Sequence, residues 1–177
     1  MNIITSSKKW DELLPESSVQ ELLKSIDSRL PGSQSLAPSS KPGSPGLVLL
    51  YGAARENKIA AAALIGDHLK QDVYRIDLSA IVSKYIGETE KNLENIFSQA
   101  ADKNWILFFD EADALFGKRT EIKDSHDRYL NIEVSYLLQR IEQYPNLVLL
   151  ATNNKRQVPL SVRKYFHAIL HFPKKKN

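Results

Sequence analysis

Two adjacent carboxylates, Asp110 and Glu111, directly follow a run of four apolar residues, Ile106–Phe109. A short apolar run of this kind predicts a strand that is buried on both faces. In an open parallel sheet, ligands bind at the carboxyl ends of the strands. An acid pair at that place suits a metal–phosphate site, in which Asp110 holds Mg²⁺ and Glu111 orients a water. A strand followed by a solvated, acidic helix cap is the alternative, and the pair alone does not decide between the two.

A second candidate site is the turn from Gly52 to Ile59, between an apolar run and a helical pattern. Phosphate-binding loops of the form G-x-x-x-x-G-K-[ST] occupy such turns, and Gly52 and Lys58 have the required spacing. Asn57 replaces the second glycine, and Ile59 replaces the hydroxyl residue that ligates Mg²⁺. Asparagine tolerates positive φ, but isoleucine offers no ligand. The turn therefore predicts weak nucleotide binding at the start of the helix, with an ordinary strand–helix turn as the alternative.

Apolar runs and helical periodicities alternate along most of the chain. The predicted strands are Leu47–Tyr51, Val73–Leu78, Ile106–Phe109, Leu147–Ala151 and Ala168–Phe172. The predicted helices between them are Lys58–Leu69, Thr89–Ala101 and Tyr129–Ile141. Strands that alternate with helices of this length indicate an α/β fold, in which a parallel sheet is covered by helices on both faces. The arrangement is a three-layer sandwich.

Composition changes divide the chain into four parts. Residues 1–30 form a predicted helical segment that Pro31 ends. Residues 31–46 are mostly Pro, Gly, Ser and Ala, which is typical of a linker. Residues 47–173 form the predicted nucleotide-binding core, and residues 174–177 form a basic tail. The N-terminal segment either packs on the core or floats on its linker.

The overall composition is that of an ordinary globular domain. The 177 residues are 42% hydrophobic and 25% charged, with a net charge of +3. The absence of cysteine excludes disulfides and thiolate metal sites. No apolar run is long enough to span a membrane, and no basic patch interleaved with aromatic residues favours nucleic-acid binding. A cytoplasmic location is the default expectation.

Residues 47–172 resemble the AAA+ ATPase family, in particular its single-module bacterial members. Three segments carry the resemblance in the family's order and spacing: Arg75–Phe97, Trp105–Arg119 and Leu149–Asn154. The resemblance implies a P-loop NTPase-like core with five parallel strands in the order 5-1-4-3-2. It also implies ATP and Mg²⁺ as cofactors, and assembly into a ring with copies of itself or with an intact AAA homologue.

The resemblance assigns roles to individual residues. Asp110 matches the Walker B aspartate, which holds the metal, and Glu111 matches the catalytic glutamate. Asn153 matches the sensor asparagine that positions the attacking water. The cofactor-binding positions of the Walker A loop fall on Gly52, Asn57 and Lys58. The segment Lys84–Gly87 resembles the pore loop, in which Tyr85 would grip a protein substrate; a surface aromatic is the alternative.

The chain departs from the family pattern at several sites. The Walker A loop is degenerate at Asn57 and Ile59. Lys164 and Tyr165 stand where the family has two arginines that reach the neighbouring subunit's γ-phosphate, and the catalytic candidate Arg163 is one residue out of register. Loss of such an arginine lowers the rate by roughly 10³ to 10⁵. After residue 173 the sequence shows no counterpart of the helical lid, so we expect a more exposed adenine.

Three interpretations remain open at this stage. The chain is an active remodelling ATPase, or an AAA-like module with weak ATP binding and impaired hydrolysis, or a gene relic. A nucleotide-independent structural or regulatory subunit is the extreme form of the second interpretation. The degenerate loop and the lost arginines favour impaired turnover. The intact Asp110 and Glu111 are unexpected if all the chemistry has been abandoned.

Overall fold

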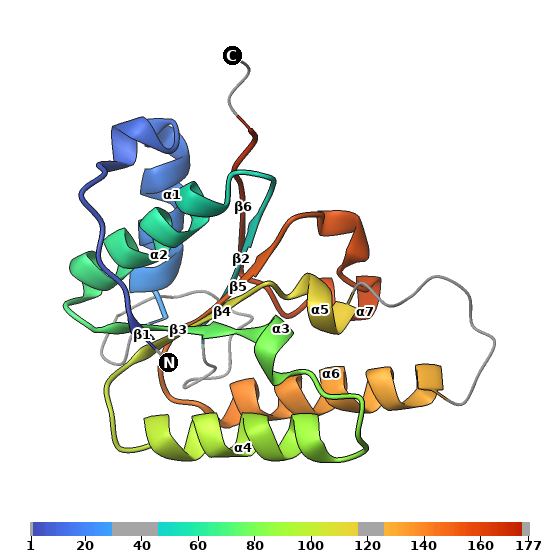
Figure 1. The fold of residues 1–177 in the computed structure, drawn as a ribbon. Coiled ribbons are helices and arrows are strands. Elements are labelled where there is room, and N and C mark those ends of the chain that lie inside the picture. The colour runs from blue at the N-terminus through green and yellow to red at the C-terminus, as the bar shows by residue number, and fades with distance from the viewer. Residues whose placement is uncertain (1, 30–45, 117–125, 175–177) are drawn as a thin grey trace.

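The structure is a computed structural model that describes residues 2–29, 46–116 and 126–174, with only the backbone for 126–131. Within these residues, six strands form one sheet in the order β1-β3-β4-β5-β2-β6 (Figure 1). The strands are β1 (Asn2–Ile3), β2 (Leu47–Tyr51), β3 (Val73–Asp77), β4 (Ile106–Asp110), β5 (Val148–Thr152) and β6 (Ala168–His171).

The five strands from β2 to β6 are parallel, as predicted. Their order is the expected 5-1-4-3-2, so the α/β class and the order of the parallel strands are confirmed. The sheet also has a strand that the sequence did not predict, because β1 pairs antiparallel to β3 at one edge. Two residues are too few to show any alternation of polar and apolar positions.

Helices cover both faces of the sheet. They are α1 (Glu16–Asp27), α2 (Arg55–Leu69), α3 (Leu78–Ile81), α4 (Glu88–Ala100), α5 (Asp113–Phe116), α6 (His126–Gln143) and α7 (Leu160–Arg163), with 3₁₀ turns at Trp10–Glu12 and Lys155–Gln157. In Figure 1, α1 and α2 lie on one face, and α4 and α6 lie on the other. Two apolar clusters, one on each face, fill the space between the layers. None of the described helices has the length and apolar character needed to cross a membrane.

The N-terminal segment packs on the core. On α1, the buried side chains Val19, Leu22 and Ile26 join the apolar cluster that α2 also contacts. Ahead of α1, the backbone N–H of Ile4 donates to the carbonyl of Val73 at 3.0 Å and extends the pairing of β1. Of the two alternatives for residues 1–30, packing on the core is therefore the observed one. The predicted linker falls almost entirely outside the described residues.

The strands end level with one another at the edge where a ligand is expected. In the sheet register, Asp77 of β3 lies beside Asp110 of β4, and Tyr51 of β2 lies beside Thr152 of β5. All these strands are parallel, so their carboxyl ends share one edge and the loops that leave them meet there.

Candidate functional site

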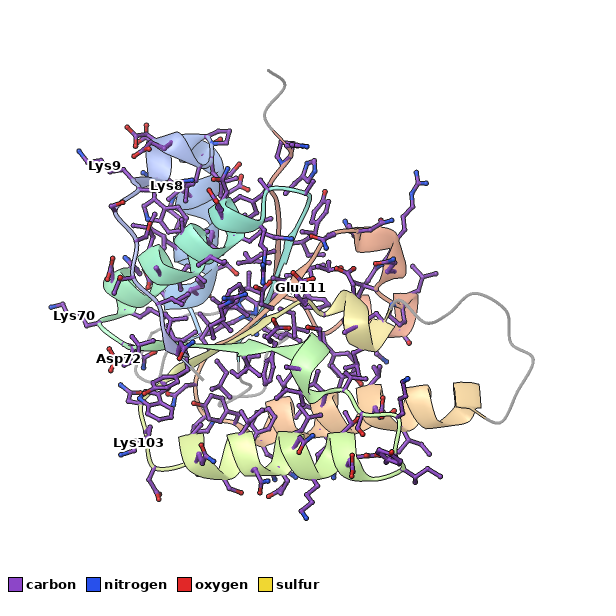
Figure 2. The ribbon with its side chains drawn as sticks, viewed as in Figure 1. Lys8, Lys9, Lys70, Asp72, Lys103 and Glu111 are labelled. Carbon is purple, nitrogen blue, oxygen red and sulfur yellow. The ribbon has the colours of Figure 1, made fainter. Side chains whose placement is uncertain are left out.

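Most of the predicted site residues meet at the carboxyl edge of the sheet. Figure 2 shows Glu111 at this edge, where β4 leaves the sheet. The residues that come together are Gly52, Lys58, Asp110, Glu111 and Asn153. Asn57 lies outside this group, and Arg163 lies at its margin. Asn57 faces the N-terminal segment, where its Oδ1 accepts a hydrogen bond from Lys8 Nζ at 2.9 Å, and Arg163 lies on α7.

Lys58 points into the protein. Its side chain rises from the first turn of α2, and the residue is only 1% exposed. The Nζ donates to the carbonyl oxygens of Gly52 at 2.7 Å and Thr152 at 2.9 Å, and to Asn153 Oδ1 at 3.0 Å. An ammonium group has three N–H donors, so protein oxygens occupy all of them. Burial lowers the pKa of Lys58, and the nearby carboxylates, first Asp110, oppose this shift.

The loop before α2 is shorter than the sequence predicted. The helix begins at Arg55 and not at Lys58, so only residues 52–54 remain as a loop. Gly52 has φ +122°, and a Cβ there would lie 2.2 Å from the carbonyl oxygen of Phe172. The N–H of Gly52 donates to Thr152, and the N–H of Ala54 donates to Phe172. These amides are bonded to the protein and do not form an open cradle for phosphate.

The absence of a second glycine explains the early start of α2. A phosphate loop keeps its residues out of the helix by adopting conformations that glycine supplies. Arg55, Glu56 and Asn57 have no such freedom, and all three are compatible with a helix. Asn57 is not among the described residues with positive φ. Asn57 does not stand in for a loop glycine, because it belongs to the first turn of α2.

Asp110 is held by two arginines. Arg75 Nη2 and Nε donate to Asp110 Oδ2 at 2.7 and 2.9 Å, and Arg55 Nε approaches the same oxygen at 3.3 Å. The other oxygen, Oδ1, accepts from the backbone N–H of Glu111 at 2.9 Å. The Asp110 side chain is 2% exposed. Both carboxylate oxygens are thus engaged by donors of the chain itself.

Glu111 has an unusual backbone. Its φ of +57° lies in the left-handed region, which non-glycine residues enter only at a cost. Immediately after it, the N–H of Ala112 donates to the carbonyl of Ala151 at 2.8 Å, which ties the turn to β5. The Glu111 side chain is 27% exposed, and its Oε1 lies 3.2 Å from Arg55 Nε. The carboxylate predicted to orient a water is therefore paired with a cation in this structure.

Asp113 also belongs to the site, although the sequence analysis did not select it. Its carboxylate accepts hydrogen bonds from the Thr152 hydroxyl and from the backbone N–H of Asn153, the latter at 2.7 Å. Asn153 is thereby fixed between Asp113 and the ammonium of Lys58. The available sequence signal was the third acid in the run from Asp110 to Asp113, at the start of a short helix.

Comparison with known proteins identifies the family. The sequence pattern of the "ATPase family associated with various cellular activities (AAA)" matches residues 48–174. This chain belongs to the AAA family. It is 33% identical over 111 residues to 26S proteasome regulatory subunit 10B of Dictyostelium discoideum, a match that covers 60% of this chain and 28% of that protein. Over 123 residues it is 34% identical to the ATPase family gene 2 protein of Schizosaccharomyces pombe, with 66% of this chain and 15% of that protein covered.

A solved structure has the same fold. The structure described as the FIGL-1 AAA domain in complex with ADP superposes with a TM-score of 0.69 at 24% identity. The superposition covers 99% of this chain and 58% of the other. This AAA chain thus spans 28% and 15% of the two relatives and 58% of the solved structure, in each case less than two thirds.

The site does not fit the Mg²⁺ that the family implies. Mg²⁺ requires near-octahedral oxygen ligands at about 2.0–2.1 Å. Asp110 is occupied by guanidinium and amide donors, and Ile59 supplies no hydroxyl. At this site of the AAA chain, the carboxylates of Asp110, Glu111 and Asp113 are bonded to other parts of the protein.

Arg163, the candidate for a trans-acting arginine, is engaged within its own subunit. Its Nε donates to the carbonyl of Val158 at 3.0 Å, and its Nη2 donates to the carbonyl of Lys155 at 2.9 Å. It also lines an open hollow of about 630 Å³ together with Gly52 and Asn153. The guanidinium therefore braces the loop between β5 and α7.

The segment that resembles a pore loop is well exposed. Tyr85 and Ile86 lie between α3 and α4 with exposed fractions of 73% and 76%. Gly87, at φ +81°, ends the segment and precedes the first residue of α4. The Tyr85 side chain is therefore available to a polypeptide, as a pore loop requires.

Proposed function

We propose that this AAA chain is a module that does not turn over ATP and acts as a structural or regulatory subunit beside other AAA subunits. The observation that carries the proposal is the state of the two groups on which hydrolysis depends. Protein oxygens take all three donors of Lys58, and protein donors engage both oxygens of Asp110. Phosphate binding would require Lys58 to exchange these bonds for bonds to the ligand.

The proposed loss of turnover has further support outside the phosphate loop. Hydrolysis in the family relies on arginines that reach the neighbouring subunit, and this chain has Lys164 and Tyr165 at those positions. The nearby Arg163 is committed to two carbonyl oxygens. Loss of an arginine finger alone lowers the rate by roughly 10³ to 10⁵. Combined with the engaged Lys58, such a loss would leave turnover undetectable in ordinary assays.

The direct test is phosphate release by the purified chain with Mg·ATP. We expect a rate indistinguishable from that of the Glu111→Gln variant, which removes the candidate catalytic carboxylate while preserving the size of the side chain. Steady, Mg²⁺-dependent release by the natural chain that disappears in Glu111→Gln would refute the proposal. Because a partner subunit can supply an arginine, the assay is repeated with an intact AAA homologue as the second component.

Nucleotide binding is a separate question from turnover. A hollow of about 510 Å³ beside the start of α2 has the size to admit a nucleotide, and its lining combines the cations Lys8, Arg55 and Lys174 with the acids Glu12 and Glu56. A ligand at 100 times its Kd stabilises the fold by about 2.7 kcal/mol, which is worth roughly 5–10 °C in Tm for a chain of this size. We expect a much smaller shift at millimolar ATP. No shift at all would identify a nucleotide-independent subunit.

The proposed partners are AAA subunits and a protein substrate. The exposure of the Tyr85 segment supports a role in contacting polypeptide. A pore-loop role of this kind depends on assembly into a ring. Sedimentation at high concentration, alone and with an AAA homologue, tests ring formation, and Tyr85→Ala tests the substrate contact. A chain that stays monomeric under all these conditions would remove the basis of the pore-loop role. The cytoplasmic location and the lack of nucleic-acid binding stay predictions.

A further inference from the structure

We infer that the guanidinium groups of Arg75 and Arg55 take the place of the metal ion beside Asp110, so that the acidic edge of this site is neutralised by the chain itself. The inference rests on the proposed function, because a permanently filled metal position explains why turnover would be absent. It goes beyond that proposal by naming the residues that exclude the ion.

The geometry around Asp110 carries the inference. Two N–H groups of Arg75 converge on Asp110 Oδ2 at 2.7 and 2.9 Å, and the Nε of Arg55 lies 3.3 Å from the same atom. The remaining oxygen accepts the N–H of Glu111. Since Asp110 is 1% exposed, almost no part of it is open to an incoming hydrated ion.

The charges reinforce the geometry. Arginine stays protonated in proteins, so both guanidinium groups carry a permanent positive charge. A divalent cation beside Asp110 would lie next to these charges and would first have to displace them from the carboxylate. Arg55 Nε also lies 3.2 Å from Glu111 Oε1, so one cation serves both members of the acid pair.

The sheet itself places Arg75 in this position. Arg75 lies on β3 two residues before Asp77, which is level with Asp110 on the adjacent strand β4. Residues two apart on a strand share a face, so Arg75 projects on the same side as Asp77. Asp77 does not compete strongly for the Arg75 guanidinium, because the Oδ1 of Asp77 caps α3 by accepting from the N–H of Ser79 at 3.0 Å.

The other oxygen atoms that a metal would need are also committed. Asp113 accepts from Thr152 and Asn153, and position 59 is an isoleucine. The two arginines therefore complete a site in which each acid already has a donor. The Arg75 side chain is 27% exposed and is the more tightly held of the two arginines. The Arg55 side chain is 47% exposed and is more solvated.

Mn²⁺ binding followed by electron paramagnetic resonance tests the inference without any nucleotide. We expect the natural chain to leave added Mn²⁺ free at concentrations up to about 1 mM. The variant carrying Arg55→Gln and Arg75→Gln should gain a bound Mn²⁺, and adding Asp110→Asn should abolish that gain. The control carries Lys9→Gln and Lys103→Gln, which lower the charge equally at exposed positions that Figure 2 shows away from Glu111. This control should bind no Mn²⁺.

Two outcomes would overturn the inference. One is Mn²⁺ binding by the natural chain that is lost in Asp110→Asn. The other is a double arginine variant that keeps its fold by circular dichroism and still binds no Mn²⁺. Neither outcome depends on phosphate release, so the inference and the proposed function fail separately. A chain that binds Mn²⁺ but releases no phosphate would refute only the inference, because its site would be open to metal and inactive for another reason.

Discussion

Replacing Asp110 with asparagine tests whether the carboxylate is a structural anchor or an unfilled metal ligand. The buried Asp110 accepts two hydrogen bonds from Arg75, at 2.7 and 2.9 Å. Removing one member of a buried ion pair costs about 3–5 kcal/mol, because the remaining charge loses its partner. Arg75 is 27% exposed and regains some hydration, so we expect a loss of about 2–3 kcal/mol.

The sign of the effect separates the two interpretations. If Asp110 faced only the acids Glu111 and Asp113, neutralising it would relieve repulsion and raise the free energy of unfolding. With Arg75 and Arg55 in place, the same change leaves two cations beside an amide and lowers that free energy. At roughly 2–4 °C per kcal/mol for a chain of this length, the expected drop in Tm is about 4–12 °C.

The assay is thermal and urea unfolding followed by circular dichroism in EDTA, with Glu111→Gln as the matched control. Glu111 makes a single 3.2 Å contact with a half-exposed arginine, so its neutralisation should change stability by about 1 kcal/mol or less. An unchanged or raised Tm in Asp110→Asn would refute the reasoning, because it would mean that the arginines do not compensate the carboxylate.

Three further perturbations probe the surroundings of the site. Gly52→Ala should lower the free energy of unfolding by about 2 kcal/mol or more, since its Cβ would lie 2.2 Å from the Phe172 carbonyl oxygen; an unchanged urea midpoint would contradict this contact. Lys58→Met should cost about 2–4 kcal/mol, because two buried carbonyl oxygens and the part-buried Oδ1 of Asn153 lose their donor, and a loss below 1 kcal/mol would argue against those bonds. Burial, aided by Arg29, lowers the pKa of His167 to about 4 from the ordinary 6.5, so the unfolded chain takes up the proton first. Stability should therefore be full above pH 6.5 and fall by about 3 kcal/mol as the pH drops towards 4, and His167→Gln should flatten this dependence in urea titrations.

The sequence was sufficient for the layers of the fold and insufficient for the chemistry of the site. The predicted runs marked the five parallel strands to within one residue. The signal is clearest for β2, β4 and β5, because strands buried on both faces are continuously apolar. The start of α2 was misplaced by three residues, because the expected loop was aligned on Gly52 and Lys58. The three residues from Arg55 to Asn57 are compatible with a helix, so α2 includes them.

The contact between Arg75 and Asp110 was beyond the sequence for a physical reason. The two residues are 35 positions apart, and their pairing depends on the register of β3 against β4 and on the face from which each side chain projects. One local sign was present, namely an arginine inside a predicted buried strand. A charge in that position needs a partner, and the nearest acids at the same sheet edge were those already suspected of holding a metal.

The presence of Asp110 and Lys58 beside a loop that carries Asn57 and Ile59 does not require turnover as its explanation. Asp110 anchors Arg75 between β3 and β4, and Lys58 joins the end of β2, the end of β5 and α2 through three hydrogen bonds. Each would be kept for stability even if no nucleotide were ever cleaved. Glu111 differs from both, because it has a left-handed backbone and a single solvated ion pair. Since its contacts contribute little to the fold, Glu111 is the residue whose retention still points to the ancestral chemistry, and it is the correct position at which to look for any residual activity.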